Sequence, residues 1–119
     1  MGSPVMWFDI VSTDPGRARE FYTQLFGWTA AAPPELGGYT LLDTGAPAAE
    51  VGGGIAAAQE GGMPAGILLY VRVDDLAATL AKAESLGGST VRDPLRLPGD
   101  NGTIAVLADP EGHAVGLWA

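Results

Sequence analysis

Hydrophobic residues follow two different periods along this chain, and the periods succeed one another in the same order twice. In the first half, alternation predicts a strand over Val5–Val11, with Asp9 as its one charged residue. A helix with a 3.6-residue period then begins near Asp14-Pro15 and ends at Gly27. Its predicted core-facing stripe is Ala18, Phe21, Tyr22, Leu25 and Phe26. Shorter apolar runs predict three more strands, over 28–32, 39–43 and 50–57.

The second half repeats this order after a linker-like stretch over 58–66. A strand is predicted over Ile67–Val73, and a helix follows Asp74-Asp75 and ends at Gly87-Gly88. Three strands are predicted after it, over 89–92, 103–108 and 114–118, with a loop over 95–102 between the first two. The last strand is entered through a turn, Asp109-Pro110-Glu111-Gly112, with His113 next to it.

The repeated order predicts an α+β fold of two tandem βαβββ modules in a single domain over 1–119. Module one covers about 5–57 and module two about 66–119. One helix covers one face of each four-stranded sheet, so two such sheets side by side are expected to form a curved half-barrel with the helices on its convex side. The concave side is the expected binding site.

Glycines interrupt the strand over 50–57, where Gly52-Gly53-Gly54 stand in a row. Glycine inside a strand indicates either a bend or bulge, or a place where another group approaches the backbone closely. The pattern leaves these two interpretations open.

Charge and composition exclude several classes of partner. The 119 residues contain 14 acidic and 6 basic side chains, a net charge of −8, which argues against binding to nucleic acid or to an anionic membrane. Such a charge favours a cationic ligand, or serves solubility alone. There is no cysteine, no signal peptide and no apolar run long enough to cross a membrane, so we expect a cytoplasmic protein.

Several short motifs occur in a fixed order along nearly the whole chain. They are Phe8-Asp9-Ile10, Asp14, Arg17–Tyr22, Leu25–Trp28, Val73–Leu76, Leu86-Gly87-Gly88 and Asp109–Gly112. In these motifs the chain resembles the vicinal oxygen chelate superfamily, which includes glyoxalases, extradiol dioxygenases, epoxide-opening fosfomycin enzymes and bleomycin-resistance proteins. The resemblance implies the paired-module fold, but the superfamily supports many chemistries.

Enzymes of that superfamily hold a divalent metal with His, Glu or Gln at three or four strand positions. In this sequence those positions fall on Trp7, Leu68 and Gly116, and in the glycine-rich run Val51–Ile55. None of these side chains is a metal donor. We therefore expect no metal and no cofactor.

Four other side chains carry oxygen or nitrogen donors that could substitute as ligands, namely Asp9, Glu50, Glu111 and His113. A histidine beside a strand start is more often a turn or surface residue than a ligand. Asp9 and Glu50 together remain a possible oxygen-ligand site or acid/base pair. If the protein is an enzyme, Asp9 is the expected catalytic residue.

The remaining face is aromatic and mostly uncharged, which suits a planar organic ligand better than it suits a filled core. The predicted ligand-binding residues are Trp7, Asp9, Trp28, Tyr39, Glu50, Leu68, Tyr70, Arg72, Gly116 and Trp118.

Two functions fit these residues. The first is a metal-free binding protein that sequesters a small hydrophobic or aromatic compound, such as an antibiotic, and so confers resistance. The second is a lyase, isomerase or other natural-product pathway enzyme, either metal-dependent or using Asp9 as acid or base. We expect a homodimer, because open sheet edges favour pairing and members of the superfamily usually dimerise.

Overall fold

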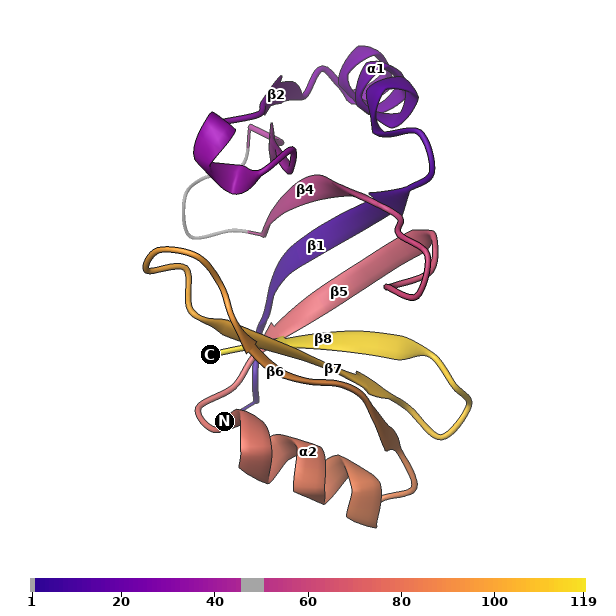
Figure 1. The fold of residues 1–119 in the computed structure, drawn as a ribbon, viewed down its shortest axis with the longest axis vertical. Coiled ribbons are helices and arrows are strands. Elements are labelled where there is room, and N and C mark those ends of the chain that lie inside the picture. The colour runs from indigo at the N-terminus through magenta and orange to yellow at the C-terminus, as the bar shows by residue number, and fades with distance from the viewer. Residues whose placement is uncertain (1, 46–50) are drawn as a thin grey trace. The chain divides into compact units, whose positions relative to one another are not determined.

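The computed structural model describes residues 2–45 and 51–119, and Figure 1 shows their fold. The elements are β1 (Val5–Ser12), α1 (Pro15–Phe26), β2 (Thr29–Ala31), the short 3-10 helix η1 (Pro34–Leu36), β3 (Thr40–Asp43), β4 (Gly52–Ala57), β5 (Gly66–Arg72), α2 (Leu76–Ser85), β6 (Ser89–Arg96), β7 (Thr103–Ala108) and β8 (Ala114–Trp118). The order confirms the α+β class and the two βαβββ modules. Their closure into a half-barrel stays a prediction.

The chain divides into two compact units, and the divisions fall inside β1 and β5. One unit is Trp7–Leu68, and the other joins Met1–Met6 to Leu69–Ala119. Within the unit that contains Leu69–Ala119, the N-terminal residues contact β5 through a hydrogen bond of 2.9 Å from the Arg72 amide to the Pro4 carbonyl.

In the unit Trp7–Leu68 the strands lie in the order β2-β3-β4-β1. β1 and β4 are parallel, whereas β3 is antiparallel to both of its neighbours. The core consists of Ile10, Leu42 and Ile55, with Phe8, Ala18, Tyr22, Trp28 and Ala30 packed against it. Because α1 supplies Ala18 and Tyr22 to this core, α1 covers the face of β1 on which Phe8 and Ile10 lie.

The other unit has the same arrangement, with its strands in the order β5-β8-β7-β6. β5 is parallel to β8, and the remaining pairs are antiparallel. Here α2 buries Leu76 and Leu80 against Ala105 and Leu117. Val71 packs on the same core, so Tyr70 and Arg72 point to the face away from α2.

The helix ends were predictable because their signals are local. The Asp14 carboxylate accepts from the Arg17 amide at 3.2 Å, and Gly27 ends α1 with a φ of 70°. Asp75 caps α2 in the same way, accepting from the Ala78 amide at 3.0 Å. Capping satisfies amides that have no partner inside the helix. No helix in the described residues is long and apolar enough to span a bilayer.

The predicted core stripe of α1 is wrong for most of its members. Ala18 and Tyr22 pack on the core, but Phe21, Leu25 and Phe26 are 58%, 58% and 54% exposed. Periodicity predicts which residues share a face, but it does not say how much of that face the sheet can cover. The helix therefore presents an apolar face, Phe21, Leu25 and Phe26, outside its own core.

A second correction concerns β6, which is longer than the predicted strand over 89–92. It continues through Pro94 to Arg96 and takes in the start of the predicted loop over 95–102. Its pairing with β7 shifts register between Thr90 and Arg92 and again between Arg92 and Leu95. β6 is an edge strand, and edge strands tolerate proline and bulges. The irregular stretch therefore still pairs with β7 on its one paired side.

The turn before β8 is held by one carboxylate. Asp109 Oδ1 accepts from the Glu111 and His113 amides, both at 2.9 Å, and Oδ2 lies 2.9 Å from His113 Nδ1. The hydrogen bond from the His113 amide is the main reason that the pKa of Asp109 lies below its ordinary value of 3.8. Because the pKa is lowered, this carboxylate supports the turn above pH 3.8 and loses that role as the pH falls through its lowered pKa. His113 is accordingly a turn residue, with its side chain 69% exposed.

Candidate functional site

Three predicted site residues meet on the face of β1 and β4 that lies away from α1. The Trp7 indole N–H donates to Tyr39 Oη at 2.9 Å and to Asp9 Oδ1 at 3.2 Å. Tyr39 Oη donates in turn to Asp9 Oδ1. All three side chains are partly buried, so they keep some surface on that face. We call Trp7, Asp9 and Tyr39 the indole–carboxylate–phenol cluster.

The glycine run in β4 is the floor on which these rings lie. The register of β4 on β1 is unbroken from Trp7–Gly52 to Ser12–Ala57, which excludes the bulge interpretation. A Cβ at Gly52 would lie 2.6 Å from the Trp7 ring, and one at Gly54 would lie 2.0 Å from Tyr39 Oη. The interpretation that holds for Gly52 and Gly54 is therefore the close approach of another group, here the side chains of Trp7 and Tyr39.

Gly53 serves the opposite face of the same strand. A Cβ there would lie 2.3 Å from the ring of Phe8, which packs on the α1 side. Three consecutive glycines thus accommodate rings on alternating faces, two on the cluster side and one on the core side.

The other unit carries a similar contact at Gly116, in β8. Gly116 is in register with Tyr70, and a Cβ at Gly116 would lie 2.5 Å from the Tyr70 ring. Arg72 and Trp118 form the next pair in the same register. All four residues lie on the face of β5 and β8 away from α2.

The indole N–H of Trp118 is used within the protein. It donates to the Asn101 carbonyl at 2.8 Å, and Gly102 makes room for it, since a Cβ there would lie 2.5 Å from Trp118 Nε1. No motif or spacing in the sequence singles out Asn101, which belongs to the loop before β7. This loop reaches Trp118 because the start of β7 pairs with the end of β8, where Ile104 lies opposite Trp118.

The repeat places Gly54 and Gly116 at equivalent positions. Superposing Asp14 on Asp75 puts Asp9 on Tyr70, and these two are in register with Gly54 and Gly116 respectively. In both units a tyrosine ring covers the glycine, Tyr39 in one and Tyr70 in the other. The sequence had narrowed the first of these positions only to the run Val51–Ile55.

The residues at the superfamily's metal positions do not fit a metal. Trp7, Leu68 and the glycines offer no donor side chain, and rings already occupy the space in which a donor side chain at Gly54 or Gly116 would begin. Within 2–45 and 51–119, no three His, Cys, Asp or Glu side chains come close enough to hold an ion.

Trp28, Leu68 and Glu50 are the remaining predicted site residues. Trp28 stacks on Tyr22 with ring centroids 5.9 Å apart and contacts Phe8, so the structure places it on the α1 side, apart from Trp7. Leu68, in β5, is buried at 4% exposure. Glu50 lies outside the described residues, and with it the proposed pairing of Asp9 and Glu50.

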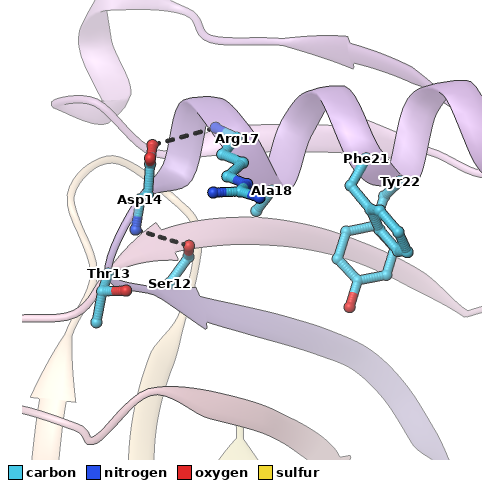
Figure 2. Close-up of a pocket in the computed structure, with 7 residues that line it drawn as sticks. All are labelled: Ser12, Thr13, Asp14, Arg17, Ala18, Phe21 and Tyr22. Atoms are coloured by element: carbon cyan, nitrogen blue, oxygen red, sulfur yellow. Dashed lines mark hydrogen bonds between the residues drawn. The ribbon is translucent and has the colours of Figure 1, made fainter.

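A separate hollow of about 300 Å³ lies at the start of α1 (Figure 2). Its polar edge is Ser12, Thr13, Asp14 and Arg17, and its apolar wall includes Phe21 and Tyr22. The Asp14 carboxylate is already engaged in capping α1, and the Asp14 amide donates to Ser12 Oγ at 3.0 Å. These contacts cap the first turn of α1, so the hollow is accounted for by the start of the helix and is assigned no ligand.

Comparison with known proteins identifies the family. Residues 6–117 match the model of the Glyoxalase-like domain. The chain is 35% identical to the "Anthracycline biosynthesis protein DnrV" of Streptomyces peucetius, over 98% of this chain and 46% of that one. It is 37% identical to the "Putative glyoxylase CFP32" of Mycobacterium tuberculosis, over 94% and 44%. The chain thus spans less than half the length of these relatives.

Solved structures agree on the fold. A glyoxalase/bleomycin resistance protein/dioxygenase superfamily member from Vibrio splendidus superposes with a TM-score of 0.62, at 12% identity over 98% of this chain and 97% of that one. At this identity the likeness concerns the fold alone. The family match over residues 6–117 shows that the chain belongs to the glyoxalase-like domain family.

Proposed function

We propose that this chain binds a planar hydrophobic or aromatic small molecule and sequesters it without a metal. The observation that carries the proposal is the pair of rings, Trp7 and Tyr39, lying on Gly52 and Gly54, at or beside a position where the superfamily holds its metal. Aromatic faces with polar tips suit a planar ligand. A relative named for anthracycline biosynthesis supports a polycyclic aromatic compound. A role in antibiotic resistance would follow from such sequestration.

Tryptophan emission tests the proposal directly. We expect anthracene derivatives to quench emission saturably, and sugars or nucleotides to leave it unchanged. Trp7→Leu should weaken binding by up to about tenfold, because stacked aromatic contacts contribute roughly 0.5–1.5 kcal/mol beyond burial.

Trp28→Leu is the matched control, since Trp28 lies in the core on the α1 side. It should lower stability but leave the affinity of the folded protein unchanged. Equal losses of affinity in the two variants, or no quenching by any polycyclic compound, would contradict the proposal.

A second candidate is an enzyme of natural-product metabolism that uses Asp9 as acid or base. The favouring observation is that Tyr39 and Trp7 both donate to Asp9 Oδ1, which fixes the orientation of this carboxylate. The relatives' names, one a biosynthesis protein and one a glyoxylase, agree with catalysis.

We also propose that the protein is a homodimer, in which a second copy covers the apolar face of α1. The two edge strands are poor candidates for the dimer interface, because β2 has only 3 residues and β6 carries Pro94 and register shifts. The face Phe21, Leu25 and Phe26 is large and exposed. The same helix carries Arg17 and Arg19 against Glu20, so it lacks the strong negative charge of the whole chain. Two copies would also approach the length of the relatives, of which one chain spans 46%.

Light scattering after gel filtration tests the assembly. We expect a mass of twice the 12.1 kDa of one chain at micromolar concentration. Leu25→Glu should shift the mass to that of the monomer, because it places a charge in the apolar face. Gln24→Glu, which adds the same charge at the neighbouring exposed position, should remain dimeric. A monomeric wild-type protein would exclude the dimer.

A further inference from the structure

The indole–carboxylate–phenol cluster is unusual in how its hydrogen-bond donors are used. It contains two donor protons, the Trp7 indole N–H and the Tyr39 hydroxyl, and both point to Asp9 Oδ1. Trp7 also donates to Tyr39 Oη. An indole nitrogen has one proton and no acceptor, and a phenol has one proton. Both donors of the cluster are therefore committed inside it.

What the cluster offers to a ligand is acceptor capacity. A carboxylate has two oxygens with about four lone-pair positions, and a phenol oxygen accepts as well as donates. The three side chains are only partly buried. A ligand carbonyl or ether oxygen would find no uncommitted proton among these three groups, whereas a ligand hydroxyl would find an acceptor that is already oriented.

We propose that this cluster selects ligands bearing a hydroxyl or other hydrogen-bond donor on a planar aromatic system. Asp9 is the accepting group, and Tyr39 is a positioning residue that holds its carboxylate. The inference rests on the proposed function, since it names the class of aromatic ligand. Hydrogen bonds to a charged group are stronger than those between neutral groups, which makes the discrimination measurable.

The arrangement of Tyr39 and Asp9 requires a glycine at position 54. A Cβ at position 54 would lie 2.0 Å from Tyr39 Oη and 2.2 Å from the ring carbon that bears it. Any side chain there displaces the phenol from Asp9. Selectivity should thus depend on a residue that does not itself touch the ligand's donor.

Two probes test the donor: 2-hydroxyanthracene and 2-methoxyanthracene share the ring system and the oxygen, and the second has a methyl group in place of the hydroxyl proton. We expect the wild-type protein to bind the hydroxyl compound about tenfold more tightly, or better, from one charge-assisted hydrogen bond. Tyr39→Phe removes only the hydroxyl and should reduce this preference severalfold, with little change in affinity for the methoxy compound. Gly54→Ala should have the same effect with all three side chains present.

Gly53→Ala is the matched control. It adds the same methyl group to the next residue of β4, but against Phe8 on the α1 side, with a Cβ contact of 2.3 Å. It should lower stability and keep the preference between the two probes. If Gly54→Ala does not fold, Tyr39→Phe decides the question alone.

The possible outcomes separate the two proposals. Tight but equal binding of both probes by the wild-type protein would overturn donor selection and leave the binding function standing. No binding of either probe would overturn both. A preference that Tyr39→Phe leaves unchanged would show that Tyr39 is merely structural.

Discussion

Gly116→Glu is expected to destabilise the protein and to leave it without a bound metal, although it restores the glutamate that related enzymes use as a ligand. The new Cβ would lie 2.5 Å from the Tyr70 ring, which is itself buried at 7% exposure. Overpacking of this kind costs about 1–3 kcal/mol, and a carboxylate placed beside a buried ring adds a desolvation cost. Urea unfolding and elemental analysis after dialysis measure the two effects.

Gly116→Ala separates the steric cause from the charge. It adds only the Cβ, so it should account for a large part of the lost stability. A stable Gly116→Glu protein that retains about one zinc, nickel, manganese or iron per chain would refute this interpretation. It would favour a metal-dependent enzyme instead.

Asp9→Asn is expected to separate the binding protein from the enzyme. Asparagine keeps an oxygen that can accept from Tyr39 and Trp7, so the cluster and the fold should survive. A binding protein should lose about tenfold in affinity or less, the value of one hydrogen bond. An enzyme that uses Asp9 as its base should keep affinity and lose turnover by roughly 10²-fold or more.

Absorbance spectra of hydroxylated polycyclic quinones incubated with the protein provide the measurement. For a binding protein the spectral change saturates at one equivalent and does not progress with time. Time-dependent conversion by the wild-type protein, slowed about 10²-fold in Asp9→Asn, would displace sequestration in favour of catalysis. Conversion that is unaffected by Asp9→Asn would remove Asp9 from the mechanism.

The features predicted well from the sequence are those with local causes. Asp14, Gly27 and Asp75 act within one helical turn, and the structure confirms them as helix ends. The strands over 103–108 and 114–118 were predicted with their correct bounds, because each is a short apolar run next to a glycine or a turn.

The features that escaped prediction depend on what lies opposite in the fold. Nothing in the sequence near Phe21 or Leu25 shows that their side chains stay more than half exposed in the fold. Trp28 and Trp7 are both tryptophans near strand starts, yet only Trp7 lies beside Asp9, because Trp28 packs on Tyr22. The role of Gly54 also depends on the pairing of β3 with β4, because the residue that covers Gly54 is Tyr39, which lies just before β3.

The interleaving of the two compact units has a consequence for the order of folding during synthesis. The unit Trp7–Leu68 is a continuous segment, so all of its residues are present once residue 68 has left the ribosome. The residues before Trp7 are made before this unit but belong with Leu69–Ala119, where Pro4 accepts from the Arg72 amide. They must therefore wait until Leu69–Ala119 has been made. Non-local closure of this kind is slow, so the second unit is expected to form last, after the first is complete.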